Sequence, residues 1–142
     1  MTATPARILP RHDFSITEID HLEDLLYDHN RHATGRHDGK GLAFVVVDEH
    51  GSQIGAIAGY SWACMVEIKQ LWVDKEHRGR GLGRRLLEAV INEATLRGCQ
   101  SVWTHSYTFQ APGLYEKCGF ERVAELTDWP PGHANIVLHR QL

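Results

Sequence analysis

The fold of this 142-residue chain is decided by residues 71–91, which read LWVDKEHRGRGLGRRLLEAVI. The first three residues of this stretch are apolar strand formers. From residue 86 onward, apolar side chains recur at the spacing of one helix face: Leu86, Leu87, Val90, Ile91 and Ala94. Three glycines, at positions 79, 81 and 83, separate the two parts. The stretch therefore predicts a strand that turns tightly into a helix lying on a sheet.

The turn between this strand and this helix has the composition of an anion-binding site. The start of a helix offers up to four unpaired backbone N–H groups and about half a positive charge. Glycines let the backbone approach an anion without a Cβ in the way. Basic side chains surround the same point: Arg78, Arg80, Arg84 and Arg85. Together these features predict a site for a dianion such as a pyrophosphate.

The two common nucleotide-binding motifs do not fit this turn. A P-loop needs Lys followed by Ser or Thr after its last glycine, but Gly83 is followed by two arginines. The dinucleotide-binding fingerprint needs the spacing GxGxxG, whereas residues 79–83 read GRGLG. The pattern therefore favours another ligand that carries phosphate.

Two motifs of the chain resemble the GNAT family of N-acetyltransferases. The run Arg78-x-x-Gly81-x-Gly83, after a strand and before an amphipathic helix, is similar to the acyl-CoA site of that family. Downstream, residues 111–120 read APGLYEKCGF and are similar to the family's closing segment, A-x-x-x-Y-x-K-x-G-F. The resemblance covers nearly the whole chain and is strongest from residue 65 to residue 124.

The resemblance implies a binding site for acetyl-CoA as co-substrate, with no metal. Backbone amides of residues 78–83 would cradle the pyrophosphate, and the strand before them would splay from its neighbour and bond the pantetheine arm. Gln110 stands near a position where the family often has Asn. The co-substrate-binding residues would be Leu71, Trp72, Val73, Arg78, Gly79, Arg80, Gly81, Leu82, Gly83, Arg84 and Gln110.

The resemblance also implies catalytic roles. Tyr115 matches the family's general acid, which would protonate the CoA thiolate as it leaves. The attacking amine must lose a proton, and Glu67 lies on the strand where several family members place an acidic residue. His105 and His133 are the other candidates for this general base.

The remaining elements predict one mixed α/β domain over residues 1–142. A capping box at Ser15 and Glu18 starts a helix that reaches residues 30–33, and Pro112 starts a short one that ends near Gly119. Apolar runs predict strands at residues 7–9, 42–47, 53–62, 65–73, 101–106, 120–126 and 135–139. We expect a mostly antiparallel central sheet with flanking helices, which is the GNAT or acyl-CoA N-acyltransferase fold.

Composition limits the classes of protein to which the chain can belong. Hydrophobic residues make up 42% and charged residues 23%, as in soluble globular domains. The longest aliphatic or aromatic run, residues 42–47, is too short for a membrane span, and residues 1–10 contain no apolar stretch of leader length. Three widely spaced cysteines form no disulfide framework, and the ten histidines predict no metal site. We therefore expect a cytoplasmic protein.

The distribution of charge suggests the acceptor. Residues 74–85 carry five basic and two acidic residues, a net +3, so the rest of the chain carries -6 of the total of -3. This balance argues against nucleic acid as a partner and suits a cationic amine, which Trp62 and Trp129 could cage. We expect a small-molecule amine acceptor, with a protein lysine or N-terminus as the second choice and a non-catalytic acyl-CoA sensor as the alternative. Dimers are common in the resembled family, so a homodimer is also implied.

Overall fold

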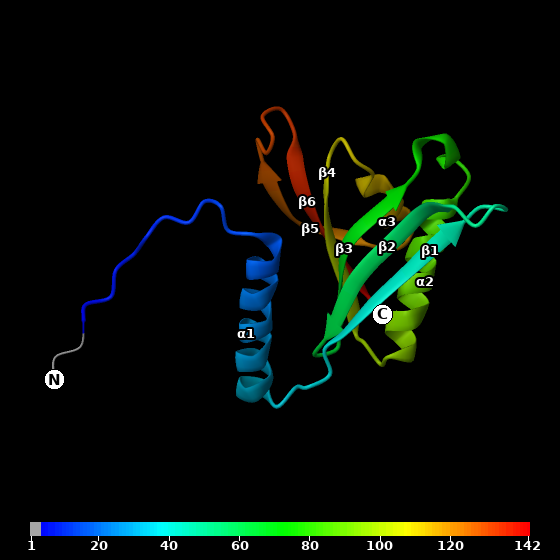
Figure 1. Cartoon of the computed structure of the whole chain (residues 1–142). Coiled ribbons are helices and arrows are strands. Elements are labelled where there is room, and N and C mark those ends of the chain that lie inside the picture. Colours follow the sequence, from blue (N-terminus) through cyan, green and yellow to red (C-terminus); the bar gives the residue numbers. More distant parts are fainter. Residues whose placement is uncertain (1–3) are drawn as a thin grey trace. The chain divides into compact units, whose positions relative to one another are not determined.

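The computed structural model describes residues 4–142, drawn in Figure 1, and divides into two compact units. The units are Met1–His37 and Asp38–Leu142, and each is described by itself. Residues 1–3, the start of the segment examined for a leader, lie outside the described residues.

The described residues of the first unit, 4–37, contain one helix, α1 (Ile16–Thr34). The predicted capping box is present: the Glu18 N–H donates to Ser15 Oγ at 3.1 Å, and the Ser15 N–H donates to the Glu18 carboxylate at 3.3 Å. The helix ends at Gly35 in the left-handed conformation, with φ of 69°. The strand predicted at residues 7–9 is wrong, because this segment pairs with no other strand among the described residues. No side chain of α1 is buried.

The second unit is built on a six-stranded sheet of β1 (Lys40–Val47), β2 (Gln53–Trp62), β3 (Met65–Val73), β4 (Ser101–Tyr107), β5 (Glu121–Thr127) and β6 (Ala134–Gln141). The strand order is β1-β2-β3-β4-β6-β5. Every neighbouring pair is antiparallel except β3 and β4, which are parallel. The prediction of a mixed, mostly antiparallel sheet is therefore confirmed.

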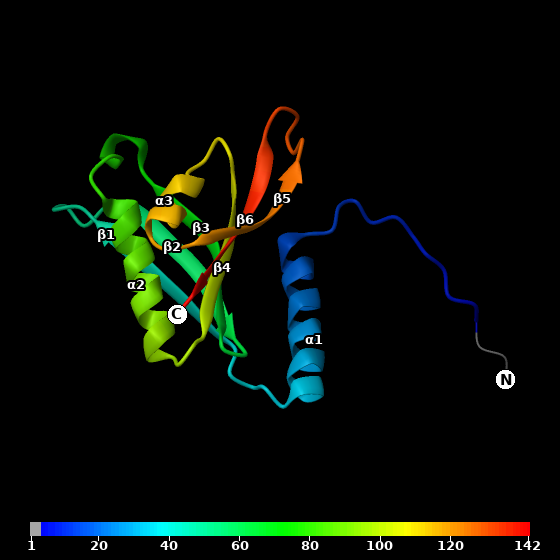
Figure 2. The same cartoon turned by 180° about the vertical axis from the view of Figure 1, so that it is seen from behind.

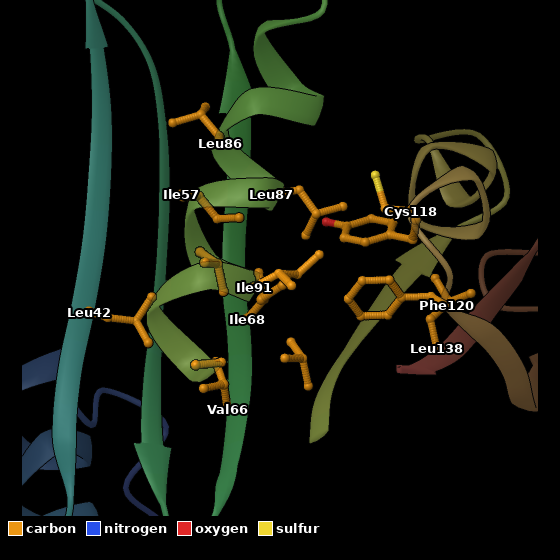
Figure 3. Packing of buried hydrophobic residues seen from close by; sticks show 14 of the residues in the cluster. Leu42, Ile57, Val66, Ile68, Leu86, Leu87, Ile91, Cys118, Phe120 and Leu138 are labelled. Atoms are coloured by element: carbon orange, nitrogen blue, oxygen red, sulfur yellow. The ribbon is translucent and has the colours of Figure 1, made fainter. Parts of the chain in front are cut away.

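Two helices of this unit, α2 (Leu82–Leu96) and α3 (Pro112–Lys117), lie on one face of the sheet (Figures 1 and 2). A short 3-10 turn, η1 (Lys75–His77), precedes α2. The five residues predicted to form the apolar face of α2 are the ones that the structure buries. Figure 3 shows Leu86, Leu87 and Ile91 of this face beside Ile57 and Ile68 of the sheet. The sheet and α2 thus enclose a single core.

A β-bulge interrupts the pairing of β2 with β3. Ala58 pairs with Gln70 and Gly59 pairs with Ile68, so Lys69 is an extra residue on β3. A Cβ built on Gly59 would overlap the backbone carbonyl oxygen of Glu67. Glycine at this position is therefore required by the close approach of two backbones.

Replacing Gly59 by Ala is expected to lower the free energy of unfolding by about 3 kcal/mol, because the added methyl group meets backbone that cannot move aside cheaply. Denaturant unfolding measures the loss. Gly41→Ala is the matched control: it lies in β1, and its added Cβ meets nothing within 4 Å. Equal unfolding midpoints for the two variants would show that the bulge tolerates a side chain.

Candidate functional site

The site begins where β3 and β4 part. Their parallel ladder contains only three pairs: Met65 with Ser101, Val66 with Val102, and Glu67 with Trp103. Beyond these pairs β3 remains bonded to β2 as far as residue 73, and β4 remains bonded to β6 as far as residue 107. The facing edges of the two strands are thus unpaired with each other, as the resemblance implied. Backbone groups on an unpaired strand edge can bond an extended ligand as they would another strand.

A buried polar contact marks the point where the strands separate. Thr104 Oγ1, from a residue that is 3% exposed, donates to the Ile68 carbonyl oxygen at 3.0 Å. The hydroxyl of Tyr115, brought in by α3, lies close to Thr104. The Tyr115 ring packs edge-on against Phe120, with 5.5 Å between ring centroids. The predicted acid thus lies at the apex of the opening.

Thr104 is a residue of this site that the sequence analysis missed. The one indication in the sequence is a hydroxyl side chain at a strand position that faces the core, whereas its neighbours Trp103 and His105 face the other side of β4. The contact with Ile68 spans 36 residues, so nothing in the local sequence indicates it.

Burial sets the protonation state of Tyr115. Desolvation raises the pKa of its phenol, and this effect outweighs the opposing influence of the nearby Thr104. The phenol therefore keeps its proton through neutral and mildly alkaline pH. In that state it can donate a proton but cannot act as a base.

The glycine-rich turn leads from β3 into α2. Gly79 and Gly81 have φ angles of 78° and 77°, and a Cβ at either position would meet nothing within 4 Å. These two glycines are needed for their left-handed backbone rather than for space. Gly81 is the N-cap of α2, and no side chain within residues 4–142 caps the helix. The first α-helical bond runs from the Arg85 N–H to the Gly81 carbonyl, which leaves the preceding amides for an anion.

Gly83 has a different role from the other two glycines. A Cβ on Gly83 would lie 3.2 Å from Leu114 Cδ2 of α3 and 4.0 Å from Val73 Cγ2 of β3. The absence of a side chain therefore allows α3 and β3 to approach the first turn of α2 closely. Sequence reasoning assigned Gly83 to ligand binding alone and missed this packing.

Two of the arginines are engaged within the protein. Arg78 Nε donates to the Val73 carbonyl at 2.9 Å and so ties the turn to the end of β3. Arg84 Nε forms an ion pair with Glu88 at 3.0 Å, one helical turn away. Arg80 is exposed. The turn thus combines open amides with a cationic rim.

Among the predicted pantetheine-binding residues, Leu71 and Val73 pack partly against the core. Trp72 is 52% exposed, so it belongs to the surface rather than to the core. Gln110 follows β4, and its Oε1 accepts a hydrogen bond from the Tyr107 N–H at 2.8 Å. This contact holds the Gln110 amide at the end of β4.

Two of the candidate bases, Glu67 and His105, lie on the opposite face of the sheet from Thr104. Glu67 is half-buried and pairs with Trp103, so their side chains share a face with that of His105, two residues further along β4. His133 lies in the loop between β5 and β6, where its Nδ1 is 3.4 Å from Thr108 Oγ1. Glu67 and His105 are thus brought to one face of the site.

The two tryptophans expected to cage an ammonium ion are not brought together. Trp62 pairs with Met65 beside the start of β4 and lines a cavity of about 210 Å³ that Cys64 and Cys99 also line. Trp129 packs edge-on against Tyr107 at the other end of β4, with centroids 5.4 Å apart. Six residues of β4, about 20 Å of strand, separate the two positions. A cage formed by both tryptophans is therefore wrong.

The described part of the chain, residues 4–142, contains no group of three or more His, Cys, Asp or Glu side chains placed to hold a metal ion. Within the same range no helix is both long and apolar enough to span a membrane.

Comparison with known proteins matches this architecture to one family. A model described as an acetyltransferase (GNAT) domain matches residues 40–122. Blasticidin-S acetyltransferase of Streptomyces morookaense is 35% identical over 97 residues, which are 66% of this chain and 70% of that protein.

Two solved structures share the fold. An acetyltransferase from Bacillus cereus superposes with a TM-score of 0.80 at 24% identity, covering 96% of this chain and 98% of that one. A Bacillus anthracis protein assigned as a streptothricin acetyltransferase, solved in complex with acetyl coenzyme A, superposes with a TM-score of 0.63 at 21% identity, covering 72% of this chain and 62% of that one. The family match, the sequence identity and the shared fold show that this chain belongs to the GNAT family of acetyltransferases.

Proposed function

We propose that the protein transfers an acetyl group from acetyl-CoA to a primary amine, by direct transfer in a ternary complex. One observation carries the proposal above all: the buried Tyr115 lies close to Thr104, whose hydroxyl donates to Ile68 at the point where β3 and β4 part. A general acid is thereby presented to any thioester that enters the opening. The proposal treats residues 1–142 as a single N-acetyltransferase domain.

The co-substrate would follow the unpaired edge of β3 to the start of α2. Leu71–Val73 would bond the pantetheine arm through their backbone groups, with Gln110 facing it from the end of β4. The amides of residues 78–83 would hold the pyrophosphate, with Arg80 adding charge from the rim. The acetyl coenzyme A in the Bacillus anthracis structure supports this choice of ligand.

The reaction would use both faces of the sheet. The amine nitrogen attacks the thioester carbonyl carbon, a C–N bond forms, and the C–S bond breaks with its electron pair passing to sulfur. Tyr115 gives its phenolic proton to the leaving thiolate. Glu67 is our assignment for the base that removes the proton of the amine, with His105 and His133 as the other groups considered. The phenolate of Tyr115 regains a proton from solvent.

The acceptor would be a small molecule. One relative that matches 66% of this chain is named blasticidin-S acetyltransferase. The net charge of -6 outside residues 74–85 favours an acceptor that arrives as a cation.

A direct assay tests this function. Acetyl-CoA and a panel of amines are incubated with the protein, and release of the CoA thiol is followed; we expect release that depends on the amine. Calorimetry at physiological salt tests binding of acetyl-CoA separately. An absence of binding would overturn the proposal, whereas binding without turnover on any amine would indicate an acyl-CoA sensor.

A further inference from the structure

One buried polar atom of the sheet has no partner. Asn135, the second residue of β6, is 3% exposed, and its Oδ1 is the one buried side-chain N or O atom within residues 4–142 that makes no hydrogen bond. Its Nδ2 lies 3.2 Å from Nδ1 of His105 on β4. A buried carbonyl oxygen that accepts no hydrogen bond lowers the stability of the fold, so the presence of an amide side chain at position 135 calls for a physical reason.

The protonation of His105 supplies that reason. While Nδ1 of the imidazole carries no proton, it accepts from the Asn135 amide, as in the structure. Once the imidazole is protonated, both of its nitrogens are donors. The Nδ1–H group of His105 would then face the Nδ2–H group of Asn135, and neither could accept from the other. A half-turn of the carboxamide then places Oδ1 on the Nδ1–H group. The atom without a partner thus gains a charge-assisted hydrogen bond when His105 accepts a proton.

The position of His105 suits proton transfer. His105 pairs with Val137 and Tyr107 pairs with Asn135, so the His105 and Asn135 side chains share the face that also carries Glu67. His105 is exposed and stands on the part of β4 that is no longer paired with β3. Since Asn135 holds Nδ1, the ring's Nε2 remains for a molecule that approaches this face.

We propose that Asn135 is a positioning residue that holds His105 as a proton acceptor for the incoming amine, beside Glu67. This inference rests on the proposed function and deepens it. Imidazole is the side chain whose ordinary titration range lies closest to neutral pH, which suits a general base. The other charged or titratable groups that the pairing places on this face are Tyr60 of β2, Glu67 of β3, Tyr107 of β4, His139 of β6 and Glu121 of β5.

The kinetic test uses a series of variants. We expect His105→Gln and Asn135→Leu each to lower kcat/KM for the amine about tenfold at pH 7, with the KM for acetyl-CoA unchanged. The acid limb of the pH profile, where protonated imidazole cannot accept a proton, should be displaced in both. Asn135→Asp should restore the rate, because its carboxylate also accepts from the Nδ1–H group. His139→Gln, on the same face, is the matched control and should behave as the wild type.

A second measurement does not depend on activity. In an NMR titration of the imidazole, the midpoint for His105 should move to lower pH in Asn135→Leu and to higher pH in Asn135→Asp, relative to the wild type. An unchanged midpoint across the three proteins would overturn the positioning role even if Asn135→Leu is less stable.

The two proposals can fail separately. A wild type that turns over while His105→Gln and Asn135→Leu keep its rate and pH profile would refute the role of His105 alone. A wild type that binds acetyl-CoA but acetylates no amine would refute the proposed function, and with it a catalytic role for His105.

Discussion

Replacing Tyr115 by Phe is expected to lower kcat about 100-fold and to leave the KM for acetyl-CoA nearly unchanged. The variant removes only the hydroxyl that lies close to Thr104 at the apex of the opening. The ring stays in place against Phe120, so the free energy of unfolding should fall by no more than about 1 kcal/mol. Steady-state kinetics and denaturant unfolding on the same preparation check both expectations.

The pH dependence provides a second check on Tyr115. Because burial raises the pKa of this phenol, the acid form persists above the ordinary tyrosine range, so the wild type should lose no activity through this residue below about pH 10. Tyr27→Phe, in α1, removes a hydroxyl elsewhere and serves as the control. A rate for Tyr115→Phe within twofold of this control would exclude Tyr115 as the acid.

Replacing Gly81 by Glu is expected to weaken binding of CoA about 100-fold, or roughly 2.7 kcal/mol. The carboxylate would stand at the N-terminus of α2, where it repels the pyrophosphate and competes for the same amides. Calorimetric titration with CoA at one fixed salt concentration measures the change.

The structure offers a matched control for backbone strain in this experiment. Gly98 follows the other end of α2 with φ of 72° and, like Gly81, has nothing within 4 Å of an added Cβ. Gly98→Glu should therefore carry a similar strain of about 1 kcal/mol but bind CoA within twofold of the wild type. Comparable losses of affinity in the two variants would place the phosphates somewhere other than the start of α2.

The elements that the sequence predicts well are those with dense local signals. β2 and β3 have the predicted bounds, and the two residues between them, Ala63 and Cys64, turn the chain with φ angles of 51° and 67°. The buried face of α2 follows from the spacing of its five apolar residues. Asp48 accepts from the amides of His50 and Ser52, both at 2.9 Å, and closes the turn between the predicted strands 42–47 and 53–62.

The features that the sequence does not predict arise from contacts between distant residues. Asn135 and His105 are 30 residues apart, and Thr104 meets Ile68 across 36. Gly83 is spaced like a ligand-binding glycine, yet the side chain that it accommodates is Leu114, on another helix. Residues 7–9 have strand propensity, but a strand also needs a neighbouring strand to bond its backbone groups. The sequence of a three-residue segment does not indicate whether such a neighbour exists.

The short ladder between β3 and β4 has a consequence for how the sheet opens. Within residues 4–142, three residue pairs join the β1–β3 half of the sheet to the β4–β6 half, and β3 and β4 are not paired beyond Glu67 and Trp103. Amide protons along the boundary should therefore exchange with solvent before those inside either half, since local opening is easiest where few bonds must break. An extended ligand that bonds β3 on one side and β4 on the other would supply the hydrogen bonds that these strands do not make with each other. With the ligand bound, the two halves of the sheet would open as one cooperative unit; without it, they would open separately.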